Sequence, residues 1–244
     1  MKSVRIILRR ELASYFATPI AYVVLVLFLL MANGFAFALG SLFERGQADL
    51  VPFFNFLPWV FVVFGPAITM RLWAEERRSG TIELLLTQPV TLWQAVLGKF
   101  LAAWAFLGIA LVLSFPLWIT VNYLGNPDNG AIFAGYIGAF LMAAVFLAIG
   151  SFTSTLTRNQ LIALLIGVWL SFMLLLAGYP MVTDWFRGWA PQWLVDGVAA
   201  LSVLTHFESI TKGVLDLRDV LYFVLFTTFF LLASAVVLDA RKSK

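Results

Sequence analysis

The sequence contains no cysteine and only one histidine, His206, among its 244 residues. Disulfide bonds and thiolate metal sites are therefore excluded, and a single imidazole leaves little scope for a histidine metal cluster. Charged residues are also scarce, since they make up 12% of the chain, whereas 62% is hydrophobic and the mean hydropathy is +0.95. A soluble domain of this size could not bury so much apolar surface. The composition therefore predicts an all-α integral membrane protein.

Motifs of the common nucleotide-binding and catalytic sites are missing as well. Gly98 and Lys99 are followed by Phe100, without the glycine-rich loop and hydroxyl residue of a phosphate-binding loop. There is no HExxH pair and no serine in a GxSxG turn. The apolar runs hold almost no ionisable side chains, which argues against ion-coupled transporters, charged-ring channels and intramembrane enzymes. We expect no catalytic residue, bound cofactor, metal or nucleic acid in this chain.

Six apolar runs are candidates for membrane spans. They cover about residues 19–40, 51–72, 100–122, 132–156, 160–178 and 220–238. Three prolines and Gly65 make the second span irregular, which lipid tolerates only where neighbouring helices cover the freed carbonyls. Between the last two spans, residues 179–219 hold charged side chains around the apolar run 194–204. We expect re-entrant or interfacial helices there, because that run is too short to cross the membrane.

The basic residues set the expected orientation. With six spans both termini lie on one side, and that side receives 12 of the 16 Lys and Arg residues. The other side has Arg45, Arg187, Lys212 and Arg218. Because positive charge favours the cytoplasmic side, both termini and the loop between spans two and three are predicted to be cytoplasmic.

The first 17 residues are basic and amphipathic. Arg5, Arg9, Arg10 and Glu11 stand among apolar residues, which is typical of a helix lying on a negatively charged leaflet. We predict an interfacial elbow helix over residues 1–17, with a basic flank that only fixes topology as the alternative. No small-residue cleavage site follows a short apolar core, so the first span is expected to be retained.

The loop between spans two and three has a helical pattern of its own. Charged residues precede Gly80, a helix start follows at Thr81–Glu83, three leucines come next, and Pro89 ends the run. A short amphipathic helix on the cytoplasmic face is the simplest interpretation. Glu83 has two interpretations: a carboxylate that favours the helix dipole, or a docking charge for a partner protein.

Span four has small residues at four-residue intervals, at Gly135, Ala139 and Ala143. Such a row lets two helices approach closely. The second helix can belong to the same subunit or to a dimer partner, and the sequence leaves both interpretations open.

The stretch EERRSGTIELLLTQPV, with Gly98-Lys99 after it, resembles the cytoplasmic coupling region of type-2 ABC transporter permeases. The recurring form of that region is G-T-x-E-x-L-L-x-x-P followed by G-K. The matching residues here are Gly80, Thr81, Glu83, Leu85, Leu86, Pro89, Gly98 and Lys99. The opening RELASYFATPIAY and the late segment 206–219 look like the gliding-motility GldF branch, and the NosY permease of nitrous-oxide-reductase maturation is next nearest. The resemblance covers essentially the whole chain.

This resemblance implies one permease domain over residues 1–244, with the coupling region at 73–99 and an extracytoplasmic or re-entrant segment at 179–219. It implies a homodimer or pseudo-dimer in the bacterial inner membrane, above two copies of a separate ATP-binding subunit that binds ATP and Mg²⁺. The helix near Thr81–Leu86 would dock in that ATPase and drive export of a substrate. The alternative is a mechanotransmitting subunit, of gliding-motility or metalloenzyme-maturation type, that acts on an extracytoplasmic auxiliary protein without moving a solute.

Overall fold

The computed structural model describes residues 2–80, 91–188 and 190–240. Within these ranges all regular secondary structure is helical, which confirms the predicted fold class for this part of the chain. The helices are α1 (Lys2–Phe16), α2 (Pro19–Ala38), α3 (Val51–Thr69), α4 (Arg71–Ser79), α6 (Leu92–Val112), α7 (Phe115–Leu124), α8 (Asn129–Leu156), α9 (Gln160–Leu176), α10 (Pro180–Arg187), α11 (Gln192–Ala200), α12 (Val203–Thr211) and α13 (Leu217–Ala240).

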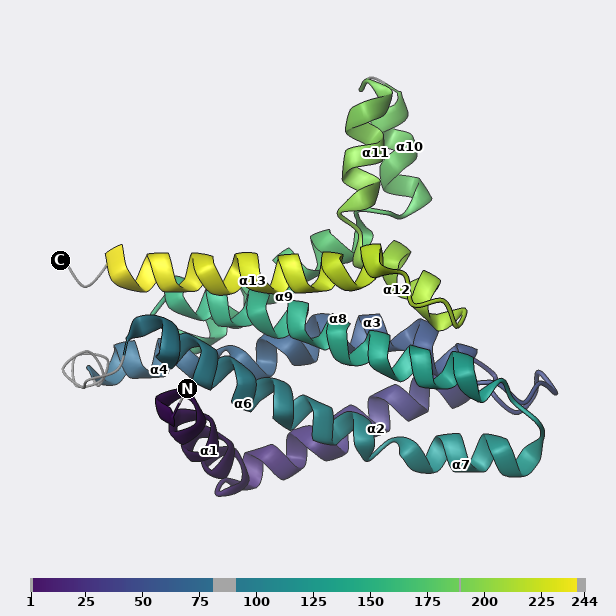
Figure 1. The fold of residues 1–244 in the computed structure, drawn as a ribbon, viewed down its shortest axis with the longest axis horizontal. Coiled ribbons are helices and arrows are strands. Elements are labelled where there is room, and N and C mark those ends of the chain that lie inside the picture. Colours follow the sequence, from purple (N-terminus) through teal and green to yellow (C-terminus); the bar gives the residue numbers. More distant parts are fainter. Residues whose placement is uncertain (1, 81–90, 189, 241–244) are drawn as a thin grey trace.

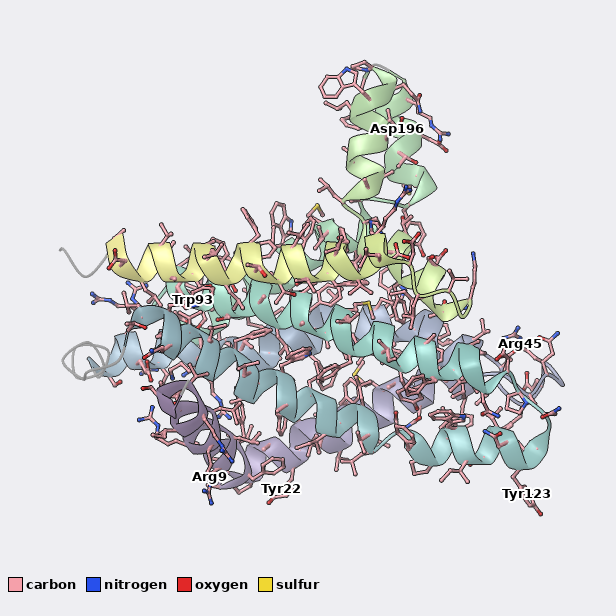
Figure 2. All side chains as sticks on the ribbon, viewed as in Figure 1. Arg9, Tyr22, Arg45, Trp93, Tyr123 and Asp196 are labelled. Atoms are coloured by element: carbon pink, nitrogen blue, oxygen red, sulfur yellow. The ribbon has the colours of Figure 1, made fainter. Side chains whose placement is uncertain are left out.

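The long helices form one bundle. Figure 1 shows α2, α3, α6, α8, α9 and α13 running lengthwise beside one another. The first helix, α4 and the last turn of α13 lie at the same end of the bundle, which we call the terminal end. Figure 2 shows Arg9 at this end, and Arg45 and Tyr123 at the opposite end. α1 and the last turn of α13 therefore lie at the same end of the bundle, as an even number of crossings requires.

Five segments in the described part of the chain are long and apolar enough to cross a membrane. They cover residues 19–38, 51–79, 92–124, 129–156 and 217–240. The multi-pass architecture is thus confirmed. The remaining predicted span corresponds to α9, an apolar helix of 17 residues, which is near the lower limit for crossing the hydrocarbon core. The count of six spans stays a prediction.

α8 is the central helix of the bundle. It packs against α3, α6, α9, α12 and α13. In its apolar 18-residue stretch 78% of the residues are buried, compared with 28% in the corresponding stretches of α2 and α13. A Cβ on Gly135 would lie 2.6 Å from the Phe54 ring, so glycine permits this close packing. Ala139 and Ala143 are fully buried inside the subunit. The row of small residues therefore serves packing within the chain.

Pro66 breaks the hydrogen-bond ladder of α3, and glycines of neighbouring helices make room for it. A Cβ on Gly150 of α8 would lie 2.6 Å from Pro66 Cα, and one on Gly167 of α9 would lie 2.8 Å from Pro66 Cβ. The Thr69 hydroxyl donates a hydrogen bond to the Gly65 carbonyl at 2.8 Å. The irregular second span is thus covered by its neighbours, as the sequence predicts.

The third predicted span contains a break that the sequence analysis does not anticipate. α6 ends at Val112, and α7 starts at Phe115 after a turn at Leu113 and Ser114. Pro116 has no N–H group to continue the ladder of α6, which explains why the helix stops here.

The segment 179–219 folds into three helices. α10 and α11 pack on each other as a hairpin that projects from the bundle, with Asp196 on it (Figures 1 and 2). α12 returns to α8 and is joined to α13, because His206 Nδ1 lies 2.6 Å from Asp219 Oδ1. The apolar run 194–204 is divided between α11 and α12, so the expected short helices are present but the run itself is not one helix.

Gly150→Ala is expected to destabilise the bundle, because the added Cβ would collide with Pro66 and Thr69 of α3. Overpacking of a filled core costs about 1–3 kcal/mol. The thermal unfolding midpoint of the detergent-solubilised protein should therefore fall. Gly34→Ala is the matched control, since nothing lies within 4 Å of a Cβ there. Equal midpoints for the two variants would contradict this packing.

Candidate functional site

Lys99 places a positive charge inside the apolar helix α6. The helix begins at Leu92, where Thr91 and Gln94 form a capping box and the Gln94 N–H donates to Thr91 Oγ1 at 3.3 Å. Two turns further along, Lys99 is only 3% exposed. A buried ammonium group without a counter-charge would be strongly destabilising, so this position requires carboxylate partners.

Glutamates from two other helices supply these partners. Lys99 Nζ lies 2.7 Å from Glu76 Oε1 of α4 and 3.3 Å from Glu11 Oε1 of α1. It also lies 5.3 Å from the ring centroid of Trp73, within the range of a cation–π contact. We call Glu11, Trp73, Glu76 and Lys99 the Lys99 cluster. It joins α1, α4 and α6 through one desolvated charge.

α4 is also fastened to the central helix. The Ser154 hydroxyl of α8 accepts hydrogen bonds at 3.0 Å from two consecutive N–H groups in the first turn of α4, one of them that of Trp73. The Trp73 indole donates to Ser151 Oγ at 3.3 Å. Near the other end of α4, Arg77 donates to the Thr155 carbonyl at 2.7 Å. The two bonds to Ser154 satisfy backbone N–H groups at the start of α4, and all four bonds together hold α4 against α8 along its length.

α1 packs on α6 through a close approach at Gly98. A Cβ on Gly98 would lie 2.7 Å from Ile7 Cγ2, so a larger residue would push the two helices apart. Tyr15 stacks on Phe106 of α6, with ring centroids 5.1 Å apart. Its hydroxyl donates to the Ile68 carbonyl of α3 at 3.3 Å. The predicted N-terminal helix is therefore formed, and one of its faces is buried against the bundle.

The opposite face of α1 is basic. Arg5, Arg9 and Arg10 are all exposed, and Arg9 points away from the bundle in Figure 2. Arg10 also donates to Glu11 Oε1 at 2.9 Å, at the edge of the Lys99 cluster. A helix with one buried and one basic face fits a location at the membrane surface, which remains our prediction for residues 1–17.

The protonation of Glu11 responds to its surroundings. Burial alone would raise the pKa of its carboxyl group, but the Lys99 and Arg10 charges, both hydrogen-bonded to it, outweigh burial and lower the pKa below its ordinary 4.5. The fold therefore favours the charged form of Glu11. Burial raises the pKa of the Tyr15 hydroxyl, which thus stays a neutral donor.

A polar cavity of about 280 Å³ lies beside the cluster. Residues of α1, α4 and α6 line it, among them Glu11, Arg71, Glu75 and Lys99. Lys99, Glu11 and Glu76 all line this space, so the ion pairs that join α1, α4 and α6 lie at its wall. Such a link can break and re-form without rebuilding a core.

The predicted coupling residues are only partly described. Gly80 ends α4 in the left-handed conformation, with φ of +73°, which favours glycine and fits the predicted break in the chain. Gly98 and Lys99 meet α1 and α4 in the contacts given above. The other predicted coupling residues lie outside the described part of the chain: Thr81, Glu83, Leu85, Leu86 and Pro89. Their roles stay predictions.

Sequence pattern alone does not identify the partners of Lys99. Glu76 is there only one of several charged residues before Gly80. The usable signal is Lys99 itself, because a lysine inside an apolar helix requires a carboxylate. Which carboxylates answer that requirement depends on how the helices converge.

Known proteins resemble this chain over most of its length. A family model described as "ABC-2 family transporter protein" matches residues 16–242. The probable multidrug ABC transporter permease YbhS of Escherichia coli (strain K12) is 26% identical over 179 residues, which cover 72% of this chain and 46% of YbhS.

The probable multidrug ABC transporter permease YbhR of the same strain is 29% identical over 145 residues, or 58% of this chain and 37% of YbhR. The chain thus spans less than half the length of these relatives. These matches do not distinguish the GldF or NosY branch.

Lys99→Met is expected to destabilise the protein, because the largely buried carboxylates of Glu76 and Glu11 would lose their ion pairs with Lys99. Removing one partner of a buried ion pair costs about 3–5 kcal/mol. The double variant Lys99→Met/Glu76→Gln should recover part of this loss. A double-mutant cycle on thermal unfolding midpoints measures the coupling, and strictly additive effects would argue against the ion pair.

Acid should weaken the attachment of α1. The folded state lowers the pKa of Glu11, so the ionised carboxylate contributes stability that is present above 4.5 and is lost as the pH falls through the folded-state pKa. Between about pH 5 and pH 3 the wild-type unfolding midpoint should fall more steeply than that of Glu11→Gln, because the glutamine amide does not titrate in this range. Parallel curves would assign the acid sensitivity to another group.

Proposed function

Because the chain belongs to the ABC-2 transporter family, we propose that it is the membrane-spanning permease subunit of an ATP-driven exporter. In this role it couples ATP hydrolysis in a separate ATP-binding subunit, which holds the ATP and Mg²⁺, to movement of a substrate across the bacterial inner membrane. The names of YbhS and YbhR make multidrug export the first activity to test.

The observation that carries this proposal is the Lys99 cluster. The predicted coupling helix lies between α4 and α6, and the ion pair between Glu76 and Lys99 joins these two helices at 2.7 Å. A push on that helix would therefore reach α4 and α6 together, and α1 through Glu11. The hydrogen bonds between α4 and α8 extend the same connection to the centre of the bundle.

The proposed mechanism is a switch between two packings. Two ATP-binding subunits beneath a homodimer or pseudo-dimer of this chain close on ATP and bind one arrangement of the coupling helices better than the other. That difference in affinity shifts the bundle between its arrangements, since packed helices and ion pairs change between discrete states. The permease chain itself would need no ATPase site for this mechanism.

The positions of the basic residues support a cytoplasmic location for the terminal end. Arg9 and Arg10 of α1 and Arg77 and Arg78 of α4 lie there, whereas Arg45 lies at the opposite end. Positive residues in short loops favour the cytoplasm. With α9 as the fifth of six spans, both chain ends are cytoplasmic.

The projecting hairpin favours a second candidate function. Trp185 of α10 and Trp193 of α11 are 65% and 73% exposed, and aromatic side chains of this kind are enriched where proteins meet. In this alternative the subunit transmits force to an extracytoplasmic protein, as in gliding motility or metalloenzyme maturation, without moving a solute. ATP hydrolysis would then be stimulated by that protein and by no solute.

Co-purification tests the proposed class directly. The tagged chain is expressed in its native host, solubilised in mild detergent, and its companions are identified by mass spectrometry. We expect an ATP-binding subunit in roughly equal amount. Recovery of the chain with no nucleotide-binding protein would contradict the proposal.

Glu83→Lys is expected to uncouple ATP hydrolysis from the permease, because it reverses the charge that we propose docks in the ATPase. The ATPase rate of the purified complex should therefore differ from that of the wild type. The permease should remain folded, as judged by its elution profile and unfolding midpoint. Glu44→Lys is a matched charge reversal in the exposed loop at the opposite end of the bundle, and it should leave the ATPase rate unchanged. An ATPase rate at the wild-type level in the Glu83→Lys complex would contradict the docking role.

A further inference from the structure

The break between α6 and α7 lies at membrane depth. Leu113 and Ser114 form the turn, and the Ser114 hydroxyl donates to the Leu111 carbonyl at 2.6 Å. Ser114 is 15 residues beyond Lys99, which places it about 22 Å along the span. A broken helix inside a membrane is tolerated only where its backbone is covered or lines a cavity. What lies beside this break is therefore informative.

A groove of about 610 Å³ runs along α6 past the break, between these helices and α8. Its lining is almost entirely apolar and includes Trp104, Ala105, Gly108, Ile137 and Phe140. The Trp104 and Phe140 rings stack with centroids 4.3 Å apart. A Cβ on Gly108 would lie 2.8 Å from the Phe140 ring, so this glycine lets the ring lie across α6 and form one wall of the groove.

The groove opens toward the membrane. Val112 and Phe115, at its edge beside the break, are 61% and 38% exposed, and Phe133 on the neighbouring turns of α8 is 57% exposed. The segments that border it, residues 92–124 and 129–156, are both long and apolar enough to span a bilayer. The medium at the mouth of the groove is therefore hydrocarbon rather than water.

The polar groups that border the groove are already paired. Trp104 Nε1 donates to the Phe140 carbonyl at 2.8 Å, and the Tyr136 and Ser114 hydroxyls lie 3.0 Å apart. A polar or charged occupant would meet no free partner in this set and would have to leave its own groups unsatisfied. Apolar cavities also exclude water. The chemistry of the lining therefore selects an apolar occupant.

The dimensions favour a single hydrocarbon chain. The lining on this side runs from Trp104 to Phe115, which corresponds to about 16 Å of helix. Half of a hydrocarbon core about 30 Å thick is about 15 Å. The groove thus has about the length of one leaflet, and its lining on α8, from Tyr136 to Leu141, lies in the half of that helix nearer Asn129.

We propose that an acyl chain of a membrane lipid occupies this groove as a bound component of the protein. The chain fills the space that the break leaves between α6–α7 and α8, with Trp104 and Phe140 against its methylene groups. This site is separate from the Lys99 cluster, and its occupancy does not depend on an ATPase partner.

Photo-crosslinking tests the proposal on the full chain. The protein is reconstituted into phosphatidylethanolamine–phosphatidylglycerol vesicles that contain phosphatidylcholine with a diazirine midway along one acyl chain, and adducts are mapped by mass spectrometry. Peptides that line the groove should be labelled about fivefold more than the exposed surface of α13 around Leu225 and Phe229, which lies outside the groove. Labelling in simple proportion to exposure would overturn the proposal.

Ala105→Phe fills the groove and should remove most of the groove adducts. Ala233→Phe is the matched control, since Ala233 of α13 is partly buried like Ala105 but lies outside the groove, and the groove adducts of this variant should stay at wild-type level. If Ala105→Phe fails to fold, Ile137→Trp fills the groove from the α8 wall. Persistent groove labelling in a folded filled variant contradicts the bound chain.

A second copy of this chain is the competing occupant. The natural sequence has no cysteine, so Ile109→Cys, at the mouth of the groove, introduces a single thiol. Rapid disulfide dimerisation in vesicles, together with absent groove adducts, would assign the groove to a protein interface instead. Monomeric Ile109→Cys with strong lipid adducts supports the acyl chain.

Discussion

A lysine ammonium group removed from water must have carboxylates at hydrogen-bond distance, and this requirement organises the terminal end of the molecule. Lys99 is buried in α6, so α1 and α4 must each bring a glutamate to it. Gly98, one residue earlier, lets α1 approach closely enough for Glu11 to reach the charge. Gly98 thus gives α1 the space to approach α6, and Lys99 gives Glu11 of α1 a charge to bind, so the adjacent pair supports the same contact in two ways.

The centre of the bundle follows from a different constraint, the space that small residues leave on α8. Its glycines and alanines admit the rings of α3 and the distorted backbone at Pro66. Serines on the last turns of the same helix hold α4 by hydrogen bonds. One helix therefore sets the packing of the membrane region and also anchors the element that enters the predicted coupling loop.

The two ends of the bundle differ in the kind of interaction that holds them. At the terminal end, ion pairs and hydrogen bonds join three helices around a polar cavity. Farther along, aromatic and aliphatic side chains surround an apolar groove at a broken helix. The permease function that we propose would use both kinds: ion pairs that can exchange near the predicted coupling region, and a span adapted to the hydrocarbon around it.

Much of this protein was predictable from local sequence. Apolar runs identify the spans because a helix in lipid must satisfy its backbone groups within its own segment. Likewise, Gly80 marks a helix end and the basic N-terminus marks an amphipathic helix, since both depend on neighbouring residues. The family resemblance rests on a short motif whose spacing is also local.

The sequence by itself therefore determined the membrane class, the approximate spans and the N-terminal helix. Only the tertiary structure decided which carboxylates meet Lys99, because Glu11 is 88 residues away and reaches it through the packing of α1 on α6. It also decided that the small-residue row of α8 packs within the chain, that α10 and α11 project as a hairpin, and that a groove lies beside Ser114. These features depend on which helix faces converge, and hydropathy along one segment does not contain that information.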